Sequence, residues 1–292
     1  MDKNLIKKNY KKKLDLFNHY NKKYFDQNIS EISDTNFDKL KKEILDLEKK
    51  YSFLKSKKSP SNNVGFKPSK NFRKALHRVP MLSLANAFDE EDLINFEKRI
   101  INYLDQRDDL EIQYSAEPKI DGISASLFYK DGELIRGLSR GDGKEGEDIT
   151  KNLKTIFDIP HFIKDKNFPK EIDIRGEVFI KNSDFKKLSD KFANPRNAAS
   201  GSLRQKNPSE TKKMPLNFIA YTFGFEKNLN IKTQSEFLKN LENWGFKINP
   251  MNKSITGIKN LVTNYNEVEK NREKLDFDID GIVYKVNDLK LQ

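Results

Sequence analysis

The stretch from residue 123 to residue 139 constrains the fold more than any other part of the chain. ISASLFY alternates apolar and polar side chains, KDGE supplies a tight turn, and LIRGLSR returns in the opposite direction. Alternation with a period of two places apolar side chains on one face of a strand, and Asp-Gly is a preferred hairpin turn. The stretch therefore predicts an antiparallel hairpin.

Other strands and several helices are predicted around this hairpin. Strands are expected over residues 172–180, 216–225 and 279–286, and helices over residues 89–104, 183–192 and 233–244. Because the strands and helices follow no strict βαβ order, we expect an α+β fold in which helices flank antiparallel sheets.

The N-terminal part has a helical pattern instead. Residues 3–25 and 35–51 repeat apolar side chains at helical intervals, and Ser33 or Asp34 is suited to cap the second helix. These two runs predict a small helical module.

A polar, turn-rich segment over residues 56–70 follows the helices. We therefore expect two domains, a helical module over residues 1–65 and a larger domain over residues 66–292. Up to residue 65 the chain has 16 lysines and nine acidic residues, so the module holds much of the formal net charge of +11. That charge favours nucleic acid or an acidic membrane surface as a partner, although a basic bias of composition would also explain it.

Composition excludes several classes of protein. Cysteine is absent, which excludes disulfides, cysteine zinc sites and thiol catalysis within this chain. The three histidines are far apart, and no HExxH zinc motif occurs. No apolar run approaches the length of a membrane span, and the N-terminus lacks the apolar core of a signal peptide. We therefore expect a soluble intracellular protein that has no membrane partner.

Lys119, in the segment EPKIDG, is the first candidate for chemistry. A free lysine ammonium is a poor nucleophile unless burial or neighbouring cations favour the neutral amine. A turn after a strand would hold the side chain in place, and Gly122 would let the backbone approach a ligand. K-x-D-G alone is weak evidence, because an exposed turn lysine is the commoner explanation in a lysine-rich chain.

Four other segments shift this balance towards a nucleotide site. Arg140 in SRGDG can hold a phosphate or a ribose, and Glu177 inside the strand IRGEVFI is a structural acid, a ribose ligand or a metal ligand. FANPRNAASGSLRQ places two arginines among small residues, which admit a ligand or pack two helices together. Lys285 on an apolar strand needs an anion such as a phosphate. This set of side chains suits transfer at the α-phosphate of a nucleotide.

Six motifs occur in order from about residue 77 to the C-terminus: HRVPMLSLANAF, EPKIDG, SRGDGKEGEDIT, IRGEVF, FANPRNAASGSLRQ and DGIVYKV. Together they resemble the adenylation domain of bacterial NAD-dependent DNA ligases. K-x-D-G alone also fits ATP-dependent ligases and mRNA capping enzymes, whereas the long FANPRNAASGSLRQ segment does not. The resemblance implies a nucleotidyltransferase domain.

The resemblance implies a chemical role for three residues. Lys119 would attack the adenylyl phosphorus of NAD, form lysyl-AMP and release nicotinamide mononucleotide (NMN). Asp121 would orient the lysine or help its proton to leave. Lys285 would bind the α-phosphate and stabilise the charge of the transition state.

The same resemblance implies further contacts with the nucleotide. Glu117 and the backbone of Ser83 and Leu84 would contact adenine, Arg140 and Glu177 would hold the ribose, and Arg196, Arg204 and Arg272 would meet DNA, the adenylate phosphates or the departing mononucleotide.

The segment YFDQNISEISDTNFDKL resembles the N-terminal NAD-specific module of these ligases, which holds the NMN half. By that match Tyr24, Asp34 and Asp38 would contact NMN. The family has His or Tyr at the position of Phe25, and Tyr at that of Phe37, so stacking can persist here while a polar contact is lost. Phe37 would equally serve to pack two helices, and Asp34 to cap one.

The resemblance also implies cofactors and partners. We expect NAD as the cofactor, together with Mg²⁺ or with Mn²⁺ instead of Mg²⁺. We expect no zinc and no metal site built entirely from protein ligands. The partner would be nicked double-stranded DNA, in which the enzyme joins a 5′-phosphate to a 3′-hydroxyl during replication and repair. The enzyme would be a monomer in the bacterial cytoplasm. The OB, zinc-finger, helix–hairpin–helix and BRCT regions of the family have no match, so we expect a fragment that adenylates itself and seals nicks weakly or not at all.

Three other functions stay open from the residues alone. An ATP-dependent nucleotidyltransferase would differ in its donor, which labelling with ATP or NAD distinguishes. A non-catalytic DNA-binding module of the same fold would bind DNA without forming lysyl-AMP. A generic basic α+β domain explains six ordered motifs poorly.

Overall fold

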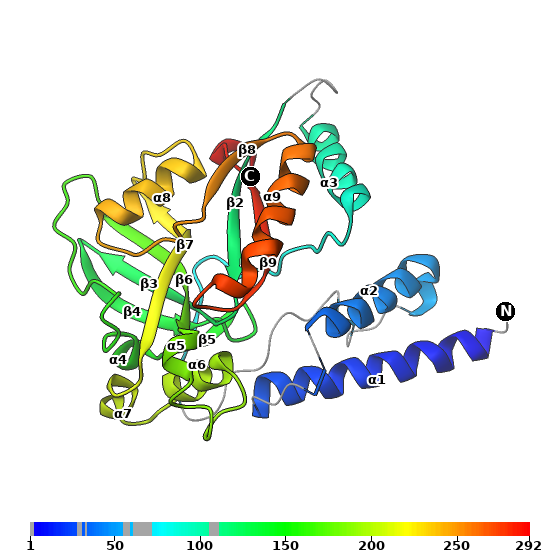
Figure 1. Cartoon of the computed structure of the whole chain (residues 1–292), viewed down its shortest axis with the longest axis horizontal. Helices are drawn as coiled ribbons and strands as arrows, with labels where there is room; N and C mark the ends of the chain where they lie inside the picture. Colours follow the sequence, from blue (N-terminus) through cyan, green and yellow to red (C-terminus); the bar gives the residue numbers. More distant parts are fainter. Residues whose placement is uncertain (1–2, 28–30, 33, 55–58, 61–71, 105–110) are drawn as a thin grey trace. The chain divides into compact units, whose positions relative to one another are not determined.

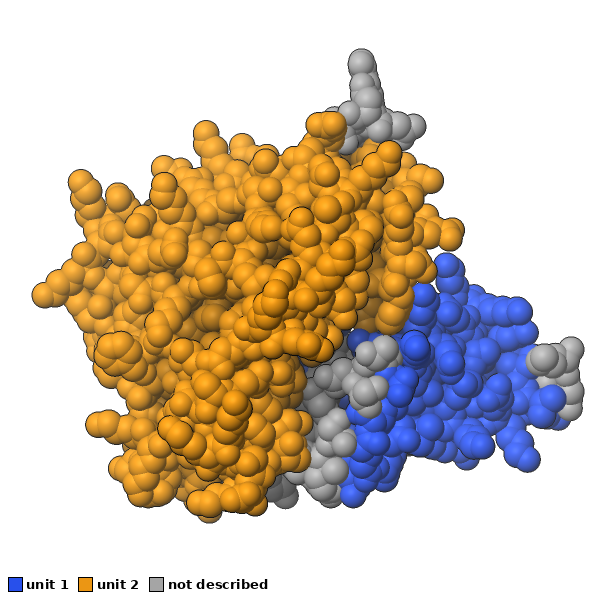
Figure 2. Space-filling model, viewed as in Figure 1, with its two compact units in different colours: residues 1–83, 140–147 blue, residues 84–139, 148–292 orange. Residues whose placement is uncertain are grey.

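A computed structural model describes residues 3–27, 31–32, 34–54, 59–60, 72–104 and 111–292 (Figure 1). The chain forms two compact units, the first made of residues 1–83 and 140–147 and the second of residues 84–139 and 148–292 (Figure 2). The proposed cap Ser33 lies outside the described residues, as does the segment 56–70 apart from Ser59 and Pro60.

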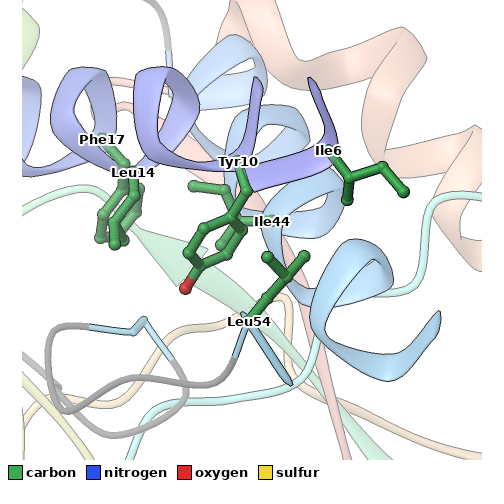
Figure 3. Packing of buried hydrophobic residues seen from close by; sticks show 6 residues of the cluster. All are labelled: Ile6, Tyr10, Leu14, Phe17, Ile44 and Leu54. Atoms are coloured by element: carbon green, nitrogen blue, oxygen red, sulfur yellow. The ribbon is translucent and has the colours of Figure 1, made fainter. Parts of the chain in front are cut away.

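The first unit contains the two helices predicted at the N-terminus. Helix α1 (Lys3–Gln27) and helix α2 (Asp34–Lys50) are followed by the 3-10 helix η1 (Ser52–Leu54). They share an apolar cluster (Figure 3) formed by Ile6, Tyr10, Leu14, Phe17, Ile44 and Leu54. Side chains at intervals of three and four on α1 point to one side in Figure 3, which confirms the helical spacing read from the sequence.

A buried carboxylate lies beside this cluster. Glu48 is 3% exposed and accepts hydrogen bonds from the Tyr10 hydroxyl at 2.6 Å and the Ser59 hydroxyl at 2.7 Å. A buried carboxylate is costly unless donors replace its water, and these two hydroxyls do so. The pair of bonds joins α1, α2 and residue 59 into one structure.

The first unit also contains a short two-stranded sheet. Strand β1 (Lys74–Leu76) pairs antiparallel with strand β5 (Glu145–Glu147). In the loop before β5, Gly143 has a φ of +87°, and its carbonyl accepts a hydrogen bond from the Met81 amide at 2.8 Å. Only glycine adopts that φ without strain, so the SRGDG sequence fits this close approach.

The second unit contains two antiparallel sheets, which confirms the predicted α+β class. The three-stranded sheet has the order β8 (Lys253–Thr256), β2 (Gln113–Ile120) and β9 (Ile279–Val286). The four-stranded sheet has the order β4 (Glu133–Ser139), β3 (Ile123–Lys130), β6 (Glu171–Ile180) and β7 (Leu216–Lys227).

The hairpin predicted from residues 123–139 is strands β3 and β4. Asp131 and Gly132 at its tip have φ values of +49° and +82°. Positive φ at both central residues is the geometry of a type I′ turn, whose twist matches that of the paired strands. The Asp-Gly pair therefore determined this element locally.

Helices cover the sheets of the second unit (Figure 1). Helices α3 (Glu90–Tyr103) and α9 (Ile258–Asn271) pack on the three-stranded sheet through a core that includes Tyr114 and Leu261, both fully buried. Helix α8 (Gln234–Asn243) packs on β7 through Phe237 and Phe223. The remaining short helices are α4 (Thr150–Leu153), α5 (Asn182–Phe185), α6 (Pro195–Leu203), α7 (Pro208–Lys212), η2 (Arg272–Lys274) and η3 (Leu289–Leu291).

Two sequence predictions differ from the structure. The helix expected over residues 183–192 is only α5, because the chain continues in turns: the Leu188 amide bonds the Phe185 carbonyl three residues back, at 2.7 Å. Helix α9 was not predicted, although Ile258, Leu261 and Val268 have helical spacing. Among the described residues, no helix is both long and apolar enough to cross a membrane.

Candidate active site

Strand β2 presents polar side chains on one face and apolar ones on the other. Its sequence QYSAEPKI alternates, so Ser115, Glu117 and Lys119 share one face while Tyr114 and Ala116 face the core. Strand β9 lies beside it with Lys119 opposite Gly281 and Ser115 opposite Lys285. Lys119 is therefore held by a sheet, whereas the sequence had placed it at a turn after a strand.

Lys119 is paired with a carboxylate. Its ammonium forms an ion pair with Asp280, the residue before Gly281 on β9. The Lys119 side chain is 46% exposed, so solvent and ligands have access to it. This contact occupies the ammonium, and a lysine becomes a nucleophile only as the free amine, so the reaction requires that Lys119 leave Asp280.

Asp121 lies two residues beyond Lys119 and holds an arginine. Its carboxylate pairs with Arg196 at 2.5 Å, and its amide donates to the Asp278 carbonyl at 2.9 Å. Burial raises the pKa of Asp121, and the charge of Asp280 adds to that effect while Arg196 opposes it. The expected neighbour of Lys119 is thus present, but its direct partner is Arg196.

Helix α6 positions Arg196. The Asn194 side chain caps the helix by accepting from the Asn197 amide at 2.7 Å, and Pro195 occupies the first turn. Proline and an Asn cap are the residues that favour a helix start. The segment FANPRNAASGSLRQ therefore contains a short capped helix whose first turn directs Arg196 to Asp121.

Glu177 on β6 lies in the same electrostatic environment. It accepts from the Ser124 hydroxyl at 2.9 Å across the pair of strands β3 and β6. Burial raises the pKa of Glu177 to about 7, while the charges of Arg196 and Lys119 lower it and that of Asp121 raises it. The interactions place Lys119, Asp121, Glu177 and Arg196 in one site built from separate segments of the chain.

A second polar cluster surrounds Glu117. One carboxylate oxygen accepts from Lys285 at 2.7 Å, and the other accepts from the Ser115 hydroxyl and the Gln234 amide, each at 2.9 Å. Lys285 and Gln234 both donate to the Tyr221 carbonyl, at 3.0 and 2.8 Å. The anion that the sequence required for Lys285 is therefore Glu117, and burial lowers the pKa of Lys285 while that carboxylate opposes the effect.

The glycine after the lysine approaches protein and not an open ligand site. A β-carbon on Gly122 would lie 2.4 Å from the Val178 carbonyl oxygen and 2.8 Å from Cγ of Glu177. Gly122 thus allows β6 to come close to the end of β2. This contact, which the sequence reading had assigned to a ligand, brings Glu177 towards Lys119.

Arg140 and Ser83 belong to the first compact unit, whereas Lys119 and Leu84 belong to the second. The Arg140 carbonyl accepts from the His77 ring at 3.1 Å, so this turn contacts the segment between the end of β1 and Met81. Ser83 and Leu84 are exposed, Leu84 by 54%.

The remaining arginines differ in setting. Arg272 donates to the Ile279 carbonyl at 2.7 Å and so fixes the start of β9 beside Asp280. Arg204 follows the last residue of α6 and is half-buried. The assignment of both residues to DNA or phosphates stays a prediction.

The proposed NMN residues lie in the helical module. Asp38 is half-buried on α2, and the side chains of Tyr24, Phe25 and Asp34 lie outside what the structure describes. Phe37 stacks on Phe17, with ring centroids 4.8 Å apart and planes inclined by 23°. Phe37 therefore packs helix α2 against helix α1, one of the two roles that the sequence allows for it.

The polar residues that were missed from sequence include Asp280 and Gln234, besides the hydroxyl donors Ser115 and Ser124. Asp280 lies within the motif DGIVYKV, and its place in that motif was the available signal. Gln234 lay at the start of an unremarkable amphipathic helix and carried no signal. Within the described part of the chain, no group of three or more His, Asp or Glu side chains is arranged to hold a metal ion.

Comparison with known proteins gives two family matches. The NAD-dependent DNA ligase adenylation domain matches residues 69–292, and the DNA ligase-like N-terminal NAD⁺-binding domain matches residues 3–65. A DNA ligase of Pelagibacter ubique is 68% identical over 97% of this chain and 42% of its own length. A DNA ligase of Parvibaculum lavamentivorans is 43% identical over 94% of this chain and 40% of its own length.

The chain thus spans about two-fifths of the length of these curated relatives. Among solved structures, a chain named Pmar-Lig_Pre. aligns over 88% of this chain and 47% of its own, with 14% identity and a TM-score of 0.41. The ATP-dependent DNA ligase of bacteriophage T7 in complex with ATP aligns over 72% of this chain and 65% of its own, with 16% identity and a TM-score of 0.36. Both scores are too low to bear on the assignment.

Proposed function

Because this chain belongs to the NAD-dependent DNA ligase family, we propose that it catalyses transfer of AMP from NAD⁺ to its own Lys119. The Lys119 amine attacks the adenylyl phosphorus, a P–N bond forms, and the P–O bond to NMN breaks. The lysine proton leaves, and NMN departs with the bonding electrons on its phosphate oxygen. The product is lysyl-AMP, whose AMP would then pass to a 5′-phosphate in nicked DNA.

One observation carries this proposal: Lys119 is fixed on a strand at the meeting point of Asp280, Asp121 with Arg196, and Glu177. A flexible surface lysine would have no such surroundings. The site supplies carboxylates that can take the proton and a guanidinium that can stabilise phosphate charge. Asp280, which is in direct contact with Lys119, is the nearer proton acceptor, and Asp121 with Arg196 orients the group.

Glu117 on β2 and Lys285 on β9 would provide further nucleotide contacts. We assign Glu117 to adenine and Glu177 to the ribose, with Arg140, Ser83 and Leu84 as further contacts. We propose that Lys285, whose ammonium lies 2.7 Å from the Glu117 carboxylate, leaves that carboxylate to bind the α-phosphate. Binding of the nucleotide would therefore exchange one anion for another at Lys285.

The helical module would hold the NMN half through Tyr24, Asp34 and Asp38. We also propose Mg²⁺, or Mn²⁺ in its place, because it neutralises phosphate charge while keeping most of its waters. Arg196, Arg204 and Arg272 would contact DNA, the adenylate phosphates or NMN, and the protein would act as a cytoplasmic monomer on nicked duplex DNA.

The test is mass spectrometry of the purified chain before and after incubation with NAD⁺ or with ATP. We expect a mass gain of one AMP with NAD⁺, no gain with ATP, and no gain in Lys119→Ala with either donor. Lys130→Ala, which alters an exposed lysine at the end of β3, is the matched control and should label like the parent chain. A Lys119→Ala variant that folds and still gains AMP would sink the assignment.

A further inference from the structure

Gln234 is a fully buried amide with a fixed orientation. Its nitrogen donates to Glu117 at 2.9 Å and to the Tyr221 carbonyl at 2.8 Å. A carboxylate and a carbonyl accept hydrogen bonds only, so both require the nitrogen and neither can face the amide oxygen. The hydrogen-bond partners therefore determine which atom of the side-chain amide is the nitrogen and which is the oxygen.

The amide oxygen of Gln234 is left without compensation. Among the described residues, this buried oxygen has no hydrogen-bond partner. Leaving a buried acceptor unpaired is unfavourable, so a smaller or apolar side chain would suit a purely structural position better. The cost is consistent with a requirement for the two donor bonds.

The start of α8 is tied to the end of β9, which keeps Gln234 in place. The backbone N–H of Gln234 donates to the Asn287 carbonyl at 2.7 Å, and the Ser235 hydroxyl donates to the Asn287 side chain at 2.7 Å. Asn287 follows β9 directly, two residues after Lys285. Gln234 is thus positioned by the same strand that supplies Lys285 to Glu117.

These contacts explain how Glu117 can stay ordered when a nucleotide binds. If Lys285 moves to a phosphate, Glu117 loses its ion pair inside the protein. Ser115 and Gln234 are neutral donors on its other oxygen, and they would keep the carboxylate fixed. The oxygen vacated by Lys285 is then free to accept from a donor on the ligand.

We propose that Gln234, assisted by Ser115, is a positioning residue that presents Glu117 as an acceptor to the amino group of adenine and so selects the base. The proposal rests on the function proposed above. Adenine carries a hydrogen-bond donor at its exocyclic amine, whereas hypoxanthine has a carbonyl there, which would oppose the carboxylate. Selection should therefore be lost when Glu117 is no longer held.

The test compares NAD⁺ with its hypoxanthine analogue, nicotinamide hypoxanthine dinucleotide, as AMP or IMP donor to Lys119. We expect the parent chain to prefer NAD⁺ by at least about tenfold in the ratio of maximal rate to half-saturating concentration. Gln234→Met should reduce that preference severalfold, mainly by raising the half-saturating concentration of NAD⁺. Lys239→Met, at an exposed position on the same helix, should keep the parent preference.

The outcomes separate the two proposals. A parent chain that takes no AMP from NAD⁺ overturns the proposed function and this inference together. A parent chain that labels but does not discriminate, or a Gln234→Met variant that labels with unchanged preference, overturns this inference alone, even if its melting temperature falls. If Gln234→Met does not fold, Ser115→Ala removes only one hydroxyl from the same oxygen, and an unchanged preference there is equally decisive.

Discussion

At the scale of single residues, burial strongly affects the ionisation of Glu177. Its pKa is raised from 4.5 to about 7 because burial disfavours the charged form. The folded chain therefore binds a proton more tightly than the unfolded chain between these values. As pH rises through this window, the unfolded state loses its proton first, and the free energy of unfolding decreases.

Replacing Glu177 by Gln should remove this pH dependence. The free energy of unfolding of Glu177→Gln minus that of the parent should rise by on the order of 1 kcal/mol between about pH 4.5 and about pH 8. This figure is reduced for the partial exposure of the side chain. Urea denaturation at both pH values measures the gain. Glu133→Gln, at an exposed position on β4, should show no such gain, and an equal difference at both pH values for Glu177→Gln would contradict the assignment.

Most residues of the candidate site could be proposed from the sequence, because each lies in a recognisable motif. Lys119, Asp121, Glu177 and Arg196 come together as separate segments fold around β2. The ion pair between Lys119 and Asp280 could not be predicted, since the sequence does not show that Asp280 precedes the residue opposite Lys119 on the neighbouring strand. Gln234 was hidden for a different reason: a buried polar side chain at a helix start has no periodic signature.

At the scale of elements, the contact between β6 and the end of β2 depends on one glycine. Gly122→Ala would place a methyl group 2.4 Å from the Val178 carbonyl oxygen, so a backbone must shift. We expect a loss of about 2 kcal/mol or more in the free energy of unfolding. AMP labelling should fall as well, because Glu177 would move away from Lys119.

The same substitution in helix α6 should act in the opposite sense. Gly201→Ala meets only the ring of Phe192, at 3.4 Å, and alanine favours a helix by up to about 1 kcal/mol over glycine. Urea denaturation of the two variants gives the comparison. Equal effects of both variants would show that crowding at Gly122 is not the cause.

Sequence patterns determined some elements better than others. The β3–β4 hairpin and α1 followed from local chemistry, a turn dipeptide and a spacing, and both were correct. The helix expected over residues 183–192 is shorter because side chains there bond the backbone in turns; the Ser189 hydroxyl, for example, donates to the Lys186 carbonyl at 3.1 Å. The order of strands within each sheet depends on contacts distant in sequence and could not be derived from spacing.

At the scale of the whole molecule, the net charge of +11 predicts how the chain should bind DNA. Lys7, Lys8, Lys11 and Lys12 are exposed on α1 and contribute to that charge. Lysines that neutralise phosphates release counterions, so affinity should fall as salt rises.

We expect affinity for nicked duplex DNA to fall about a hundredfold between about 50 and about 200 mM salt, the loss for about four neutralised phosphates. Fluorescence anisotropy across this range measures the slope. Replacing Lys7, Lys8, Lys11 and Lys12 by Gln should make the slope shallower if α1 contributes. An affinity that does not depend on salt would argue against binding through phosphates.

The pairing of β1 with β5 has a consequence for how the chain could be divided. Because residues 140–147 belong to the first unit, the backbone passes between the units three times. A break between residues 83 and 84 would leave β1 on one piece and β5 on the other, still joined by the hydrogen bonds of their ladder. The molecule is therefore suited to fragment complementation, in which residues 1–83 and 84–292, made separately, reassemble through a strand that each piece lacks alone.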